Sequence, residues 1–203
     1  MTDYFALLDE PRRPWIDPEA LKRKFLTMSA LAHPDRAHNS DESHRAAAAQ
    51  SYAELNSAYN CLRDPKERLA HLLQLELGTK PQDLQTMPAD LAEKFLEVAQ
   101  LCRQADAFLV EKARVKSPLL QVQLFERGQQ WVQKLNELQG RLAAHHANLI
   151  QRLEALDAEW GTAPANSAAR TETLRRLEEL YRLLSFFSRW TAQIQERLVQ
   201  LAI

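Results

Sequence analysis

The chain has 203 residues, of which 45% are hydrophobic and 26% are charged. This length is sufficient for one domain, or two small ones, with an apolar core that needs no disulfide to stabilise it. The 26 basic and 27 acidic residues leave a formal net charge of -1, so there is no basic excess to neutralise phosphates and we expect no nucleic-acid partner. With only 4 glycines and none of the glycine-rich signatures of nucleotide-binding loops or hydrolase elbows, the composition favours an all-helical protein.

The sequence shows no signal for a metal, a cofactor or a membrane partner. Cys61 and Cys102 form no CxxC pair and lie in apolar helical patterns, so we expect two buried, reduced thiols. His145 and His146 are adjacent on a predicted helix, where side chains point about 100° apart and cannot readily chelate one ion. Since no secretory signal and no membrane-spanning apolar run is visible, we expect a cytoplasmic protein.

Residues 1–77 are expected to form four helices, because helix-start signals recur between stretches with helical apolar spacing. Asp17-Pro18 and Asp64-Pro65 each combine an N-cap residue with proline at the first helical position. Ser40-Asp41-Glu42 begins another helix, and Gly78 is expected to end the last one. The apolar face expected for the helix after Asp17 consists of Leu21, Phe25, Met28 and Leu31.

Residues 89–203 contain three longer amphipathic patterns, separated from the first part by a linker over residues 78–88. The second pattern begins at Ser117-Pro118, and the third begins at about Arg170 after a loop over residues 161–168. Three such apolar faces can bury one another as a bundle that is antiparallel between neighbours. The residues expected in its core include Leu91, Phe95, Val98, Cys102, Ala105, Leu109, Phe125, Leu135, Leu142, Tyr181, Leu184, Phe186, Phe187 and Trp190.

The tripeptide His33-Pro34-Asp35 lies in a polar loop between two predicted amphipathic helices. From the residues alone its role is open. Proline stops the first helix, and Asp35 is suited to accept hydrogen bonds from N–H groups of the loop, so one interpretation is a capping turn. The other is a general acid/base pair of His33 and Asp35, although nothing nearby supplies a nucleophile or an oxyanion hole.

The segments around this tripeptide give it a more specific interpretation. A short helix starts at Asp3-Tyr4-Phe5, and the helix before the tripeptide carries a basic cluster. The helix after the tripeptide ends in Asn56, Ala58, Tyr59, Leu62, Asp64, Pro65 and Arg68. This order of elements resembles a J-domain over residues 3–75. The resemblance implies a protein partner, because the HPD loop and basic second helix of J-domains engage a DnaK-type ATPase chaperone and trigger its ATP hydrolysis.

An N-terminal J-domain followed by a linker and a helical bundle is similar to the HscB family, the co-chaperones of iron–sulfur cluster biogenesis. The segment from Leu69 to Leu75 resembles the end of the J-domain in that family, and the position of Trp160, before the final loop, resembles the C-terminal region of the family. We therefore predict an all-α fold, with a four-helix J-domain at residues 1–77 and a three-helix, client-binding bundle at residues 89–203. The protein would be no enzyme itself, and would deliver an IscU-type iron–sulfur scaffold to an HscA-type chaperone.

The resemblance assigns two sets of binding residues. For the chaperone they are Lys22, Arg23, Lys24, His33, Pro34, Asp35 and Arg36. For the scaffold they are Leu91, Glu93, Phe95, Leu96 and Glu97, on the first bundle helix. This second segment lacks the methionine and much of the acidic run of the family. Leu91 and Phe95 also fit core positions, whereas Leu96 lies off the apolar seam.

Three further functions are compatible with the sequence. The first is a J-domain protein that serves a general DnaK chaperone, with a different client or a second copy on the bundle. The second is an enzyme that uses His33 and Asp35. The third is a structural, coiled-coil-like bundle, in which a His33→Gln substitution has no functional consequence.

Overall fold

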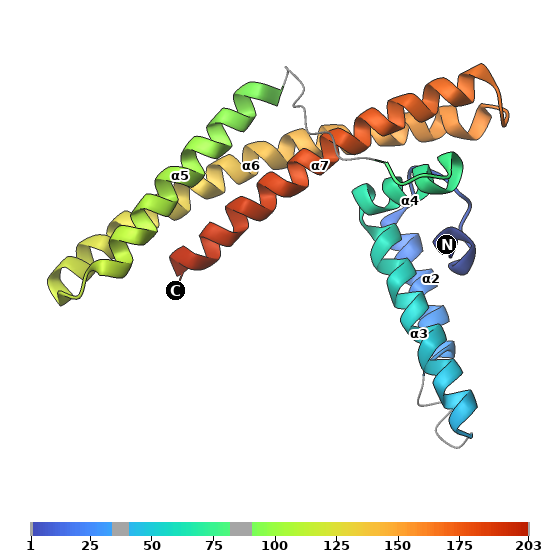
Figure 1. The fold of residues 1–203 in the computed structure, drawn as a ribbon, viewed down its shortest axis with the longest axis horizontal. Coiled ribbons are helices and arrows are strands. Elements are labelled where there is room, and N and C mark those ends of the chain that lie inside the picture. Colours follow the sequence, from blue (N-terminus) through green and yellow to red (C-terminus); the bar gives the residue numbers. More distant parts are fainter. Residues whose placement is uncertain (1, 34–40, 82–90, 203) are drawn as a thin grey trace. The chain divides into compact units, whose positions relative to one another are not determined.

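The computed structural model describes residues 2–33, 41–81 and 91–202, and the regular structure in these ranges is helical throughout (Figure 1). The helices are α1 (Tyr4–Leu7), α2 (Pro18–Leu31), α3 (Glu42–Arg63), α4 (Pro65–Leu77), α5 (Ala92–Arg114), α6 (Pro118–Thr162) and α7 (Ala168–Ala202). The predicted all-α class is confirmed, and within these described ranges four helices precede Gly78 and three follow it. The connection between α6 and α7 is shorter than predicted, because α6 continues through Gly161.

Contacts divide the chain into two compact units. Unit 1 comprises Met1–Gln82 with Ile150–Tyr181, and unit 2 comprises Asp83–Leu149 with Arg182–Ile203. Helices α6 and α7 therefore contribute to both units, and their 150–181 hairpin belongs with α1 to α4. The sequence predicts a different kind of division, into J-domain, linker and bundle, which is based on composition and helix signals. That division stays a prediction.

The helix ends lie where the cap signals predict them. Asp17 accepts hydrogen bonds from the backbone N–H groups of Glu19 and Ala20, at 2.9 and 3.2 Å. Asp41 and Asp64 cap α3 and α4 in the same way. Gly78 has a φ of +74°, the left-handed conformation in which glycine meets no steric penalty, and it ends α4.

Unit 1 is built on the α2–α3 hairpin, whose two helices lie side by side (Figure 1). The Phe25 ring stacks on the Tyr59 ring with centroids 4.1 Å apart, and Leu21 and Leu62 are buried between the helices and their neighbours. Leu31 was expected on this buried face, but it is exposed. It lies ten positions after Leu21, so on an α-helix it points about 80° away from it.

The buried Arg68 side chain ties three segments of unit 1 together. Its Nε donates to the Pro14 carbonyl at 2.8 Å, and its Nη1 donates to the Leu62 carbonyl at 2.6 Å. Burial lowers the pKa of this guanidinium to about 10. A buried charge is tolerated only with such hydrogen bonds. Arg68 therefore joins the end of α3 and the segment before α2 to the first turn of α4.

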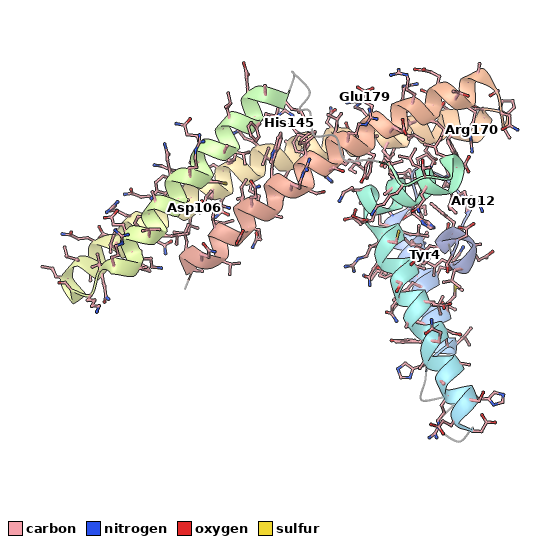
Figure 2. The ribbon with its side chains drawn as sticks, viewed as in Figure 1. Tyr4, Arg12, Asp106, His145, Arg170 and Glu179 are labelled. Atoms are coloured by element: carbon pink, nitrogen blue, oxygen red, sulfur yellow. The ribbon has the colours of Figure 1, made fainter. Side chains whose placement is uncertain are left out.

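The α6–α7 hairpin of unit 1 holds the segment that connects α1 with α2. The buried carboxylate of Asp157 forms an ion pair with Arg13 and accepts the backbone N–H of Trp15 at 3.2 Å. Nε1 of the buried Trp160 donates to the Arg12 carbonyl at 2.9 Å. On α7, Arg170 donates to the Trp160 carbonyl, and Figure 2 labels Arg12 and Arg170 in this unit. The bonds from Arg13 to Asp157 and from Trp160 to Arg12 join residues 144 and 148 positions apart.

In unit 2, α5, α6 and α7 are joined by ion pairs and by an apolar core. Arg141 of α6 pairs with Glu97 of α5, and Arg197 of α7 donates to Asp106 of α5 at 2.7 Å (Asp106 is labelled in Figure 2). The core contains Leu91, Val98, Cys102, Ala105, Phe108, Leu124, Leu135, Leu138, Leu142, Leu149, Leu184, Phe186, Phe187, Trp190 and Ile194. The aromatic residues of α7 are buried, as the sequence predicts.

Three predicted core positions of unit 2 are not buried. Phe95 and Phe125 are exposed and Leu109 is only half-buried, whereas Phe108 and Leu124, which the periodicity did not select, are buried. On α5, Phe95 points about 60° away from Val98 and so falls outside the buried stripe. On α6, Leu124 points about 100° away from Phe125, and only one of these neighbours can face the core.

We predict that Asp157→Ala lowers the free energy of unfolding by about 2 kcal/mol, because it removes a buried acceptor of charged and backbone donors. Urea unfolding followed by circular dichroism measures this change. The matched control is Glu172→Ala, which breaks the exposed Glu172–Arg175 pair and should leave stability unchanged. Equal effects of the two substitutions would contradict the structural role of Asp157.

We also predict that stability falls as the pH drops below about 6.5, and that His71 contributes to this loss. The buried His71 ring accepts the backbone N–H of Tyr4 at Nε2 (3.0 Å) and stacks on the Tyr4 ring. Burial lowers the pKa of His71, so between its folded and unfolded pKa values the unfolded chain binds more protons. Urea unfolding between about pH 5.5 and pH 7.5 should show a shallower pH dependence for His71→Gln than for His44→Gln, the exposed control.

Candidate functional site

The first candidate surface lies on unit 1, at the C-terminal end of α2. His33 follows α2 by two residues, and its ring meets the Tyr52 ring of α3 edge-on, with centroids 5.4 Å apart. This contact fixes the start of the predicted chaperone-binding loop against the α2–α3 hairpin. Pro34, Asp35 and Arg36 lie outside the described residues, so the tripeptide is placed only through His33.

The three predicted basic residues of α2 do not share one environment. Lys22 and Arg23 are exposed. Lys24 instead points back to the segment after α1, where its Nζ donates to the Asp9 carbonyl at 2.6 Å and pairs with Glu10 at 2.8 Å. Lys24 therefore anchors α2 within unit 1, and its charge is offset by a carboxylate.

The exposed face of α2 also carries a leucine that the sequence interpretation did not select. Leu26 is 56% exposed and follows Lys22 by one helical turn, and Leu31 is exposed near the end of the helix. The signal was present in the sequence, since Leu26 lies outside the apolar stripe of Leu21 and Phe25. We call Lys22, Arg23 and Leu26, together with His33 after the helix end, the α2 surface. It combines positive charge with apolar area.

The second candidate surface lies on unit 2, at the N-terminal half of α5. Leu91 is buried in the core, whereas Phe95 is 42% exposed and Leu96 is 60% exposed. Glu93 and Glu97 are exposed, and Glu97 is paired with Arg141 of α6. We call Glu93, Phe95, Leu96 and Glu97 the α5 surface. Its two neighbouring apolar side chains are available to a protein partner, which Leu91 is not.

The groups that serve metal binding or nucleophilic chemistry elsewhere are not arranged for it in the described part of the chain. No cluster of three or more His, Cys, Asp or Glu side chains there could hold a metal ion. Cys102 is buried as predicted, whereas Cys61 is only half-buried. Burial raises the pKa of the Cys61 thiol to about 11 and also raises that of Cys102, so both thiols stay protonated near neutral pH. None of the helices within the described ranges combines the length and apolar character needed to span a membrane.

The same fold occurs in two solved structures, although no protein-family model matches the sequence. The human co-chaperone protein HscB matches with a TM-score of 0.65 and 16% identity, over 96% of this chain and 81% of that one. The chaperone HscB from Vibrio cholerae matches with a TM-score of 0.52 and 20% identity, over 93% of this chain and 96% of that one. The chain has the HscB fold. The resemblance seen in the sequence is confirmed for the architecture.

We predict that Leu91→Ala lowers the free energy of unfolding by about 2–4 kcal/mol, because it leaves a cavity in the core of unit 2. Leu96→Ala, five residues further along the chain, should change it by less than about 0.5 kcal/mol, because Leu96 is already largely in water. Chemical denaturation of both variants compares them directly. A large loss for Leu96→Ala would mean that this side chain is part of the core.

Proposed function

We propose that the chain is an HscB-type co-chaperone. The N-terminal part binds a DnaK/HscA-type ATPase chaperone through the His33-Pro34-Asp35 loop and stimulates its ATP hydrolysis. The helical bundle delivers an IscU-type iron–sulfur scaffold to that chaperone. The chain itself carries out no covalent step in this proposal, since hydrolysis takes place on the chaperone.

One observation carries the proposal: the tripeptide of J-domains begins at the end of α2 in a chain that has the HscB fold along nearly its whole length. The motif residues after the tripeptide have structural roles that support this interpretation. Tyr59 stacks on Phe25, Asp64 caps α4, and Arg68 bonds to the end of α3. Of these contacts, the Tyr59–Phe25 stack joins α3 directly to α2, the helix that His33 follows.

The α2 surface suits a transient complex with a chaperone. Lys22 and Arg23 would attract an acidic face and raise the association rate more than the affinity. Leu26 adds apolar area that becomes buried only in the complex. Lys24 is expected to contribute little, because Glu10 already pairs with it.

The α5 surface suits a client that offers an apolar recess. Phe95 and Leu96 are adjacent and exposed, and exposed apolar side chains that lie together are typical of an interaction site. The Glu97–Arg141 pair fixes one edge of this surface on α6. A scaffold protein bound here would bury Phe95 and Leu96 together.

A second candidate function is a J-domain protein that serves a general DnaK-type chaperone with another client. The composition of the α5 surface favours it, since Lys94 interrupts the acidic run and Arg141 offsets the charge of Glu97. The effect of the scaffold on ATP turnover distinguishes the two functions.

We predict that this chain and an IscU-type scaffold together stimulate ATP turnover of an HscA-type chaperone more than either does alone. His33→Gln should reduce the stimulation at least about tenfold. A tenfold change corresponds to about 1.4 kcal/mol, which lies within the coupling free energy of about 1–3 kcal/mol that is typical between two binding sites. His44→Gln, which alters an exposed histidine in the first turn of α3, is the matched control. Stimulation of a DnaK-type chaperone alone, without an effect of scaffold, would support the second candidate function. No stimulation of either chaperone would contradict both.

A pair of leucine substitutions separates the two binding surfaces in the same assay. Leu26→Asp should lower stimulation and leave scaffold binding intact, whereas Leu96→Asp should abolish the scaffold effect and leave basal stimulation intact. Both side chains are exposed, so neither change should unfold the chain. Loss of both activities in either variant would show that the two surfaces do not act separately.

A further inference from the structure

Tyr52 of α3 lies on the same helix face as Tyr59, whose ring stacks on Phe25 of α2. The two tyrosines are seven residues apart, so they point within about 20° of each other on the helix. Both are half-buried, as expected for rings at the edge of a seam between two helices. The face of α3 that packs against α2 therefore continues to Tyr52.

The two helices extend unequally from the Phe25–Tyr59 stack. From Phe25, α2 continues for six residues to Leu31, a rise of about 9 Å. From Tyr59, α3 runs back for 17 residues to Glu42, a rise of about 26 Å, and passes Tyr52 after about 10 Å. Tyr52 is thus level with the end of α2, and the residues that follow α2 are the ones within reach of its ring.

His33 is the residue that meets this ring. The two rings lie edge-on, with centroids 5.4 Å apart and an angle of 76° between their planes. This geometry is favoured because the positive edge of one aromatic ring meets the negative face of the other. His33 is nonetheless exposed, so the contact orients its ring without burying it. A side chain that is already oriented loses less conformational entropy when a partner binds it.

The backbone that carries Tyr52 is held by its own helix. Leu55, one turn further along α3, is buried, and the side-chain amide of Asn56 donates to the Tyr52 carbonyl at 2.8 Å. Asn56 is one of the residues of the J-domain resemblance, and this bond gives it a structural role beside Tyr52. The orientation of the His33 ring therefore follows from a fixed point on α3.

We propose that Tyr52 is a positioning residue for His33, and that its ring holds the imidazole in the orientation that the chaperone recognises. The inference rests on the proposed function and deepens it, since Tyr52 belongs to neither candidate surface. Without the Tyr52 ring, His33 has to be ordered when the complex forms, so binding is weaker while the imidazole itself is unchanged. Removing His33 has a different effect, because the recognised group is then missing.

The first measurement is spectroscopic and needs no chaperone. In the full chain with isotope-labelled histidine, the ring C–H signals of His33 are identified by NMR through their loss in His33→Gln. Ring currents of Tyr52 should displace these signals from those of the exposed His44. Tyr52→Leu should move them toward the His44 signals, whereas Tyr52→Phe, which keeps the ring, should leave them in place. Signals that are not displaced in the wild-type chain, or that do not move in Tyr52→Leu, overturn the proposal.

The second measurement is ATP turnover of the chaperone at increasing concentrations of the chain, without scaffold. Tyr52→Leu should raise the concentration for half-maximal stimulation about two- to tenfold, as expected when one side chain has to be ordered on binding, and leave the maximum within about twofold. Tyr52→Phe should behave as the wild-type chain, whereas His33→Gln should lower the maximum. Leucine occupies much of the space of a half-buried tyrosine, so Tyr52→Leu should keep the fold.

Trp131→Leu is the matched control, because it removes a half-buried ring that packs on Phe108 in unit 2, and it should leave both measurements unchanged. If the wild-type chain stimulates the chaperone and Tyr52→Leu does so at the same concentrations, only the positioning role is overturned. If Tyr52→Phe is as weak as Tyr52→Leu, the hydroxyl contacts the partner directly, which also overturns it. If the wild-type chain stimulates no chaperone, the proposed function fails and this inference fails with it.

Discussion

The structure of unit 1 depends on how four consecutive residues, Arg12 to Trp15, are held. The Arg12 carbonyl accepts Nε1 of Trp160, the Arg13 guanidinium pairs with Asp157, the Pro14 carbonyl accepts Nε of Arg68, and the Trp15 N–H donates to Asp157. This segment has no regular structure of its own, so its polar groups need partners elsewhere. It finds them on α4 and on the α6–α7 hairpin, and thereby joins helices that are far apart in the sequence.

The two candidate surfaces depend on this framework in different ways. The α2 surface is presented by a hairpin whose stability comes from the Phe25–Tyr59 stack and from Arg68, so the residues that make the J-domain resemblance recognisable are mostly structural. The α5 surface depends on which stripe of α5 is buried, since Phe95 and Leu96 point about 60° and 160° away from the buried Val98. Motif residues thus support one surface, whereas helical geometry alone exposes the other.

Local signals made most of the fold predictable. Asp17, Asp64 and Gly78 cap helices through contacts with residues only a few positions away, so these helix ends could be predicted directly from the sequence. The exposure of Leu31, Phe95 and Phe125 could not be predicted from the sequence. Apolar spacing locates the centre of a buried helix stripe, but it does not show which of two neighbouring apolar residues at the edge of that stripe is buried. The Lys24–Glu10 and Arg13–Asp157 pairs were equally hidden, since charge in a sequence does not reveal its partner. The His33-Pro34-Asp35 tripeptide was recognised from the order of the sequence motifs around it, and its last two residues lie outside the described ranges.

The hydrogen bond from the Trp15 N–H to Asp157 places a sheltered amide outside any helix. Amide protons in connecting segments usually exchange with solvent quickly, while this one is held by a carboxylate of the α6–α7 hairpin. Its deuterium uptake therefore reports how often the hairpin and the N-terminal helices separate. A single backbone position thus gives a direct readout of the cohesion of unit 1, without any substitution or attached probe.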